Sequence, residues 1–342
     1  MFKLCLLFCL SVGVSAQTLT SQIANMIIIG FEGEKVPKNL ARFIHENGIG
    51  GVILFKKNIK NPAQLQLLTR ELKSLDSTIM IATDQEGGLV ERLSDKNGFY
   101  HTPKPVEVAR MGEETAKVVY ESMAKMLHST GINVNFAPSV DLAKNPKNRV
   151  IFKYGRAFSA NPKEVIRYGG IFMKAMEKEG VLSVLKHFPG HGSSLADSHK
   201  GFVDVSESWG KEELEPFTGL DAKMVMSAHI FNRYLDEKYP ATLSKKSNAI
   251  LRKSGFDGVL VSDDLQMRAI SQNYDLNTTL KAGINASVDM LLFGNQLARP
   301  IMIETLVKNI QALVKSGDID IRRIREANRR INALKKELYA RR

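Results

Sequence analysis

The feature of this sequence that most constrains its fold is a set of eight short apolar runs, rich in Ile and Val, spaced along almost the whole chain. Each run is continuously apolar rather than alternating with polar residues, which is typical of parallel strands covered on both faces. Segments with a helical pattern of apolar residues lie between them. The runs fall at 27–31, 49–55, 78–83, 133–140, 181–187, 223–228, 258–262 and 290–293.

The segments between the runs carry recognisable helix boundaries. Asn61 and Asn161 each stand as a capping residue directly before a proline in the first turn. Gly131 and Gly180 stand where helices are expected to end. Strands and helices that alternate in this way predict an α/β fold, a (β/α)8 TIM-type barrel. The chain of 342 residues is long enough for one such domain.

A doubly wound open sheet is the competing architecture. It is disfavoured because the sequence has no glycine-rich phosphate loop with the spacing of a nucleotide fold. No linker rich in Pro or Ser divides the chain, so a single domain is expected.

The N-terminus has a different character from the rest of the chain. Lys3 is followed by an apolar run at 4–10 and then by small residues ending at Ala16. These features describe a secretory signal peptide, and the run is too short to span a bilayer core of roughly 30 Å. We therefore predict a signal peptide over residues 1–16 and an exported mature domain over residues 17–342. The alternative is a first buried strand or helix of the domain.

Both cysteines, Cys5 and Cys9, lie inside the predicted signal peptide, so the mature chain would contain none. It would then have no thiol nucleophile and no thiolate metal site. Lipid attachment at Cys9 is a weaker alternative, because the apolar run before it is short.

The C-terminal segment is strongly basic and has a helical pattern. Residues 321–342 contain nine Lys and Arg side chains against Glu326 and Glu337, in a chain with a net charge of +12. Apolar positions recur every three or four residues, which predicts an amphipathic helix with one face packed on the domain. We expect its basic face to be a solvated surface. Attraction to an anionic partner such as cell wall, phospholipid or nucleic acid is the alternative.

Polar residues gather where the predicted strands end. Because the carboxyl ends of barrel strands meet at one mouth, where such folds build their active sites, we expect these side chains to converge. They are Asp84, Asp141, Lys186, His187, His229, Asp263 and Asp264.

Four motifs carry a resemblance to a known family. Segment 84–88 reads Asp-Gln-Glu-Gly-Gly, and segment 155–158 reads Gly-Arg-Ala-Phe. Segment 186–192 reads Lys-His-Phe-Pro-Gly-His-Gly and leads to Asp-Ser-His at 197–199, and segment 262–267 reads Ser-Asp-Asp-Leu-Gln-Met. In their order and spacing these motifs resemble glycoside hydrolase family 3, specifically its β-N-acetylglucosaminidase branch. The resemblance covers almost the whole chain after the signal segment.

The resemblance implies a retaining mechanism with no cofactor and no metal. Asp263 matches the family's nucleophile, the carboxylate that attacks the anomeric carbon. Asp264 is its rival by position, with a helix cap as its other role. The acid/base implied for this branch is His199, held by Asp197 on the loop after the fifth strand. An ionised aspartate stabilises the imidazolium form, which can protonate the leaving oxygen and later deprotonate water.

The same resemblance implies a set of sugar-binding residues. A carboxylate can accept hydrogen bonds from sugar hydroxyls, and cations can donate to hydroxyl or acetamido oxygens. A structural ion pair is the alternative role for each. The five residues are Asp84, Arg92, Arg156, Lys186 and His187. His191, His229 and Asp141 are not assigned to this set, and we expect them to shape the pocket.

Two departures from the family pattern concern substrate preference. Leu89 stands where many members have arginine, and the proline usual a few residues after His199 is missing. Both leave the catalytic groups in place. Two-domain relatives take their acid/base from a second domain. Because this chain is expected to end after the barrel, the acid should come from a barrel loop, which favours His199.

The expected function is removal of terminal β-linked N-acetylglucosamine from peptidoglycan fragments or chitooligosaccharides. A cell-wall role favours the periplasm over full secretion. One alternative is a phosphorylase, in which phosphate replaces water. Another is an exported glycan-binding protein without turnover. Apart from its glycan, the chain is expected to bind no nucleic acid, to insert into no membrane and to act as a monomer.

A zinc site is a further alternative, with His187, His191, Asp197 and His199 as its ligands. The neighbouring Lys186 would oppose a bound cation, so no metal is expected.

Overall fold

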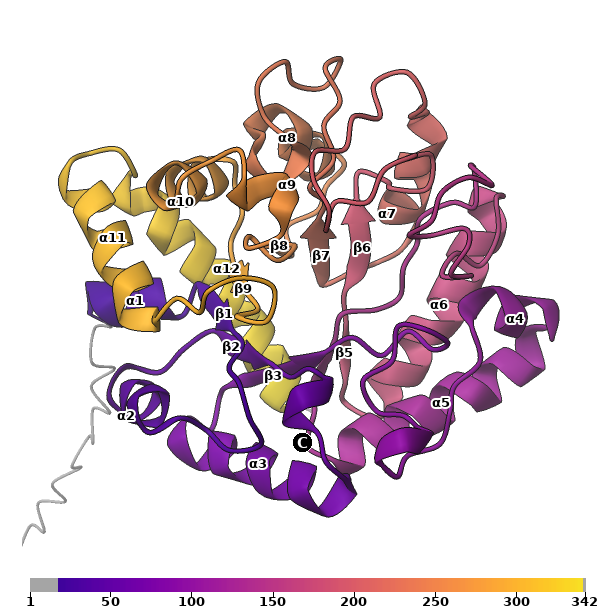
Figure 1. The fold of residues 1–342 in the computed structure, drawn as a ribbon, viewed down its shortest axis with the longest axis horizontal. Coiled ribbons are helices and arrows are strands. Elements are labelled where there is room, and N and C mark those ends of the chain that lie inside the picture. Colours follow the sequence, from indigo (N-terminus) through magenta and orange to yellow (C-terminus); the bar gives the residue numbers. More distant parts are fainter. Residues whose placement is uncertain (1–17, 341–342) are drawn as a thin grey trace, which may run out of the picture.

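The computed structural model describes residues 18–340. The predicted signal peptide lies outside these residues and stays a prediction. In the described part, parallel strands lie in the middle of the molecule and helices surround them (Figure 1). No helix within it is long and apolar enough to cross a membrane.

Each predicted apolar run contains a strand, and the fifth run contains two that are separated by one residue. The fourth strand is much shorter than the run that predicted it, because Pro138 in that run has no amide N–H for a ladder. The strands are β1 (Ile27–Ile29), β2 (Gly51–Ile53), β3 (Met80–Thr83), β4 (Val134–Asn135), β5 (Leu182–Ser183), β6 (Leu185–Phe188), β7 (Met224–Ser227), β8 (Val259–Ser262) and β9 (Leu291–Phe293).

The strands form two parallel sheets. One has the order β5-β4-β3-β2-β1-β9 and the other the order β6-β7-β8. Parallel bridges outside the named strands pair Ser139 with Lys186 and Val261 with Met290, so backbone contacts also link the two sheets. The result is an α/β, TIM-barrel-like fold with helices outside the strands.

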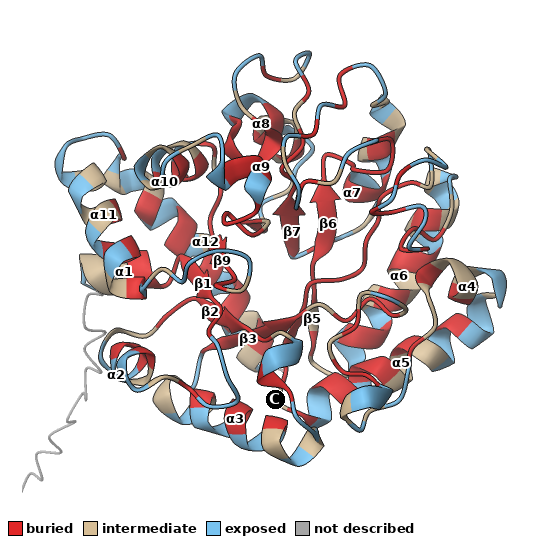
Figure 2. Ribbon diagram, viewed as in Figure 1, coloured by how far each residue is buried: buried red, intermediate tan, exposed pale blue. Residues whose placement is uncertain are grey.

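The helices turn their buried faces toward the strands and their exposed faces outward (Figure 2). They are α1 (Leu19–Ala24), α2 (Lys38–Asn47), α3 (Pro62–Leu75), α4 (Pro105–Arg110), α5 (Glu113–Ser129), α6 (Pro162–Lys178), α7 (Glu215–Gly219), α8 (Lys245–Lys253), α9 (Arg268–Ser271), α10 (Leu276–Asn285), α11 (Ile303–Lys315) and α12 (Ile321–Ala340).

The predicted helix boundaries are confirmed. The side chains of Asn61 and Asn161 cap α3 and α6 by accepting backbone N–H bonds in the first turn. Gly131 and Gly180 follow α5 and α6 with φ of 82° and 67°, a left-handed conformation that favours glycine.

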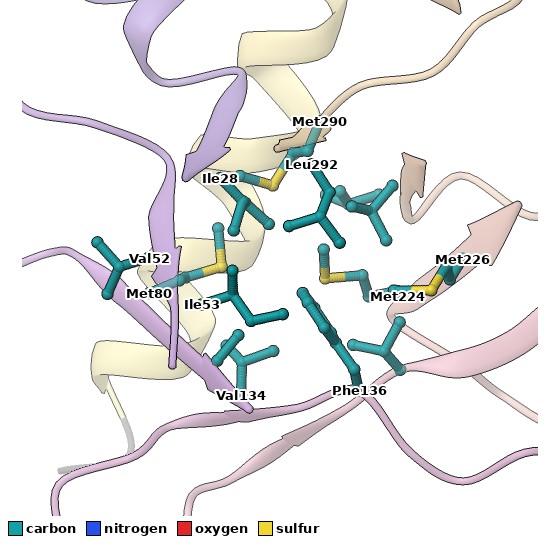
Figure 3. Packing of buried hydrophobic residues seen from close by; sticks show 14 of the residues in the cluster. Ile28, Val52, Ile53, Met80, Val134, Phe136, Met224, Met226, Met290 and Leu292 are labelled. Carbon is teal, nitrogen blue, oxygen red and sulfur yellow. The ribbon is translucent and has the colours of Figure 1, made fainter. Parts of the chain in front are cut away.

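The space between the strands is filled by apolar side chains. Figure 3 shows Ile28, Val134, Phe136, Met224 and Met290 pointing into the space between the strands. All five are almost completely buried. The centre is therefore a packed core, and the polar strand ends lie beyond it.

Helix α12 packs as predicted by the apolar pattern, with Ile324, Ile331 and Leu338 buried. Its basic face is only partly the solvated surface that we expected. Arg323 and Arg330 both pair with the buried carboxylate of Asp289.

A third α12 cation is also engaged by the body of the protein. Lys335 is buried and donates from Nζ to the carbonyl oxygen of Ile49 at 2.8 Å. Burial lowers the pKa of Lys335 to about 8. Part of the basic charge of α12 therefore holds the helix in place.

Candidate active site

A cavity of about 330 Å3 lies where the strands end at their carboxyl termini. Its volume falls in the range of roughly 300–1,000 Å3 that is usual for small-molecule sites. The structure brings all eight predicted site residues to its wall. They are Asp84, Arg92, Arg156, Lys186, His187, Asp197, His199 and Asp263.

On one side of the cavity, Asp84 is held by two cations. Its Oδ2 accepts from Arg92 Nη2 at 2.8 Å, and its Oδ1 accepts from Lys186 Nζ at 2.9 Å. Burial alone would raise the pKa of Asp84, but the charges of Lys186 and Arg92 hold it well below its usual range. The carboxylate is therefore ionised, and it presents fixed acceptors at the cavity wall.

Glu86 is a functional candidate that the sequence reasoning missed. It is 1% exposed and accepts from Arg156 through both oxygens, with Nε–Oε2 and Nη2–Oε1 distances of 2.8 Å. It also pairs with Lys186 Nζ at 2.7 Å. Lys186 thus lies between two carboxylates, and Glu86 orients two of the predicted sugar-binding cations. Its place in the Asp-Gln-Glu motif was the available signal.

Asp141 does more than shape the pocket. Its Oδ2 accepts from Nδ1 of His187 at 2.6 Å, and its Oδ1 accepts from the backbone N–H of His191 at 2.7 Å. Arg156 donates to the other ring nitrogen of His187, Nε2, at 3.2 Å. These contacts fix both the tautomer and the orientation of the imidazole, so Asp141 is a positioning residue for His187.

We refer to Asp84, Glu86, Arg156, Lys186 and His187, with their partners Arg92 and Asp141, as the charge cluster. Its members are paired with each other, which is the structural role given as the alternative, and five of them also line the cavity. Contact with a sugar stays a prediction for them. The pairing gives any ligand a pre-organised array of donors and acceptors.

Asp263 directly follows β8 and is half-buried. Burial would raise its pKa, but the nearby imidazoles of His229, His187 and His199 hold the pKa of Asp263 below its ordinary value. Its carboxylate is therefore ionised near neutral pH, as a nucleophile requires.

Asp264 has a different environment. Its Oδ1 accepts from the backbone N–H groups of Gln266 at 3.0 Å and Gly294 at 3.1 Å. Burial raises the pKa of Asp264 to about 6, and the charge of Asp263 adds to the rise. These contacts favour a structural, cap-like role for Asp264 and leave Asp263 as the better nucleophile candidate.

The two remaining histidines are held by local partners. His229 donates from Nε2 to the backbone oxygen of Asp264 at 2.9 Å, and its Nδ1 lies 2.9 Å from Oγ1 of Thr242. His191 contacts Ser194 Oγ at 2.7 Å, and burial lowers the pKa of His191 to about 4. His191 is therefore neutral near pH 7 and lines the cavity, and His229 is fixed in place by its two contacts.

The predicted acid/base pair lies on the loop after β6. Nδ1 of His199 is 2.9 Å from Asp197 Oδ1, which also accepts the backbone N–H of His199 at 3.0 Å. The His199 side chain is 53% exposed. With Nδ1 engaged, Nε2 is the ring nitrogen that can exchange a proton with a ligand.

Within residues 18–340, no group of three or more His, Cys, Asp and Glu side chains is arranged to hold a metal ion. A larger hollow of about 620 Å3 lies beside α12, at the amino ends of β7 and β8. Its cations Arg329 and Arg330 are both paired with Asp257. None of the predicted site residues lines this larger hollow, so the smaller cavity at the carboxyl ends is the better candidate site.

Comparisons with known proteins show the family to which the chain is similar. The Glycosyl hydrolase family 3 N terminal domain matches residues 18–334. Beta-hexosaminidase A of Pseudoalteromonas piscicida is 37% identical over 287 residues, which cover 75% of this chain and 48% of that protein. Beta-hexosaminidase of Pseudomonas aeruginosa (strain LESB58) is 33% identical over 259 residues, which cover 73% of this chain and 76% of that protein.

A solved structure is similar over nearly the whole chain. It is a glycoside hydrolase family 3 beta-N-acetylglucosaminidase from Paenibacillus sp. str. FPU-7, with a TM-score of 0.86 and 31% identity, covering 95% of this chain and 63% of that one. The chain thus spans less than two thirds of the Paenibacillus and Pseudoalteromonas relatives. The profile match over residues 18–334, the identity to these relatives and the shared fold together show that the chain belongs to glycosyl hydrolase family 3.

Proposed function

We propose that this chain is a retaining exo-β-N-acetylglucosaminidase that hydrolyses terminal β-linked N-acetylglucosamine from peptidoglycan fragments or chitooligosaccharides. The observation that carries the proposal is the composition of the cavity. An ionised carboxylate, an imidazole held by a carboxylate and five members of the charge cluster line one cavity at the strand ends. The names of the hexosaminidase relatives support the choice of sugar.

In the first step, the Asp263 carboxylate attacks the anomeric carbon while the bond from that carbon to the leaving oxygen breaks. His199, as imidazolium, gives its Nε2 proton to that oxygen. The product is a glycosyl ester on Asp263. In the second step, water gives a proton to the now neutral imidazole and attacks the anomeric carbon, and the ester bond to Asp263 breaks. Asp197 stabilises the imidazolium at the start and end of the cycle.

The proposal takes the two sheets as one closed eight-stranded barrel with the cavity at its mouth. The bridges from Ser139 to Lys186 and from Val261 to Met290 support closure. We also propose export, with residence in the periplasm, and action as a monomer. The apolar run and small residues before Gln17 support export.

The test is hydrolysis of a chromogenic β-N-acetylglucosaminide, with the anomer of the first-formed sugar followed by NMR. The proposal predicts β-N-acetylglucosamine at a rate that does not depend on phosphate. Phosphate-dependent release of a sugar phosphate would identify a phosphorylase. Binding of the sugar without turnover would identify a glycan-binding protein, and an α-anomeric first product would contradict retention.

A further inference from the structure

The loop that carries Asp197 and His199 begins with a fixed segment, residues 189–194, which we call the loop stem. Carbonyl oxygens of the stem at His191 and Gly192 accept from Asn148 Nδ2 at 2.9 and 3.2 Å. The half-buried Trp209 donates from Nε1 to the Pro189 oxygen at 3.1 Å. Beyond the stem the loop becomes exposed, so the stem sets where the acid/base pair is presented.

Glu213 contacts the loop stem and fixes its backbone. It lies in a short 3-10 helix, Lys211–Leu214, and is 1% exposed. Its Oε2 accepts from the backbone N–H of Gly192 at 2.9 Å. At Gly190, with φ of 118°, an added Cβ would lie 2.5 Å from Cβ of Glu213, so stem and side chain are in direct contact. The stem is thus clamped between Glu213 on one side and Asp141 on the other.

Resting on the proposed function, we propose that Glu213 is a positioning residue for the acid/base loop, which acts by fixing the stem so that His199 faces the leaving group. Nothing in the proposed chemistry uses Glu213 directly. Its carboxyl contacts the stem, and the reacting groups lie several residues further along the same loop.

The surroundings of Glu213 favour its neutral form. Burial raises the pKa of Glu213 to about 7, and the charge of Asp141 adds to the rise, while the Ser193 and Gly192 groups oppose it. Other charged groups nearby offer no compensation: His191 is neutral, and Lys144 pairs with the adjacent Glu212 at 2.8 Å.

Two buried polar atoms also favour the neutral form of Glu213. Oε1 of Glu213 and Oγ of Ser193 both lack a hydrogen-bond partner in the described part of the chain. A protonated Glu213 can donate to the Ser193 hydroxyl while its other oxygen keeps the Gly192 bond. An ionised Glu213 is a buried charge without a cation, which is unfavourable. Ionisation should therefore loosen the stem.

The first test separates positioning from general structural support by the leaving group. In Glu213→Ala the backbone N–H of Gly192 loses its acceptor, so proton transfer from His199 to the leaving oxygen should become slower. At about pH 6, kcat/KM for a disaccharide should fall about 10-fold, a part of the roughly 10²–10⁴ that general acid help provides. The kcat/KM of a dinitrophenyl glycoside, which reports the glycosylation step and whose leaving group departs without a proton, should change less than about twofold. Glu212→Ala, one residue away, is the matched control and should match wild type for both substrates.

The second test uses pH. Gln at position 213 keeps an acceptor for Gly192 but cannot ionise. Glu213→Gln should match wild type near pH 5.5 and exceed it several-fold on the disaccharide near pH 8.5, on either side of the pKa of about 7. The ratio of the two enzymes' rates at each pH removes every pH dependence that they share.

A third measurement needs neither turnover nor a variant that folds. Trp209 is the only tryptophan of the chain and contacts the stem. Its emission in the wild-type protein should change with a midpoint near pH 7. Flat emission between pH 5.5 and 8.5, or equal losses for both substrates in Glu213→Ala, would overturn the positioning role. Failure of wild type to cleave either substrate would instead contradict the proposed function.

Discussion

The charge cluster and the loop that carries His199 are built in opposite ways. In the cluster, Asp84 and Glu86 are ionised and held by cations, and the buried Glu86 pairs with Arg156, which lies 70 positions away. On the loop, Asp197 and His199 are two residues apart, and the imidazole is half exposed. The cluster stands at strand ends, whereas the pair stands in an exposed loop.

This difference assigns separate tasks to the two regions. Buried ion pairs at strand ends fix donors and acceptors before a ligand arrives, which suits recognition of one sugar ring. A proton donor must reach leaving groups of different shape and exchange protons with water, which suits a loop. Substitutions in the cluster should therefore affect stability and binding, and substitutions on the loop should affect proton transfer alone.

The largest expected effect on turnover is at Asp263, the proposed nucleophile. Asp263→Asn should lower turnover of all substrates by about 10⁴-fold or more, as loss of a nucleophile does in other enzymes with covalent intermediates. The fold should survive, because Oδ1 of an amide can still accept from the Asp264 N–H. Initial rates and circular dichroism check both points. An inactive Asp264→Asn beside a nearly normal Asp263→Asn would reverse the assignment.

A substitution in the cluster should mainly affect stability. Glu86→Gln removes the negative charge that pairs with the buried cations Arg156 and Lys186. Loss of one partner of a buried ion pair should lower the free energy of unfolding by about 3 kcal/mol. Urea unfolding measures this change. Glu114→Gln, which breaks an exposed pair with Lys117, is the control and should leave the free energy of unfolding close to that of wild type. Similar values for the two variants would contradict the account of the cluster.

The loss of stability at low pH should also differ between the charge cluster and the loop that carries His199. The pKa values of Asp84 and Asp141 lie below their ordinary range in the folded protein, so the unfolded chain binds protons more tightly. Their stabilisation is fully present above the unfolded value of about 4 and is lost as pH falls through the folded values. Unfolding free energy measured from pH 5 to pH 3 should fall, and Asp197→Asn should follow wild type closely. If the free energy of unfolding of Asp197→Asn depended less on pH than that of wild type, the exposed pair of Asp197 and His199 would also stabilise the fold.

The smallest expected effect on turnover is that of Asp197→Asn. The imidazole remains, but it loses the charge that stabilises its protonated form. We expect a loss of about 10-fold on disaccharides and little change on dinitrophenyl glycosides. The disaccharide rate should also decline at lower pH than in wild type. A pH–rate profile of kcat/KM checks this, and an unshifted alkaline limb would show that Asp197 only orients the loop.

The sequence predicted the parts of this fold that depend on local pattern. Continuous apolar runs located the strands, because burial on both faces leaves no polar positions. The Asn-Pro pairs located two helix starts, because capping acts over three residues. The structure brought the eight predicted site residues to one cavity, although their roles stay predictions.

Pairings between distant residues could not be predicted in this way. Glu86 meets Arg156 across 70 positions, and Asp141 meets His187 across 46. No local pattern shows that Asp289 lies against α12 and takes up its arginines, so the basic face looked solvated. The role of Glu213 likewise depends on a loop stem that folds back onto it.

The most direct test of the account concerns His199→Ala. The decisive quantity is the ratio of kcat/KM for a dinitrophenyl β-N-acetylglucosaminide to that for a disaccharide, compared with wild type. We expect kcat/KM for the disaccharide to fall about 10²–10⁴-fold. The dinitrophenyl substrate should keep fast glycosylation and show a burst, because deglycosylation lacks its base. Unfolding free energy should stay near wild type. Equal losses for both substrates would mean that His199 only binds the sugar, and the proton donor would have to lie elsewhere at the cavity wall.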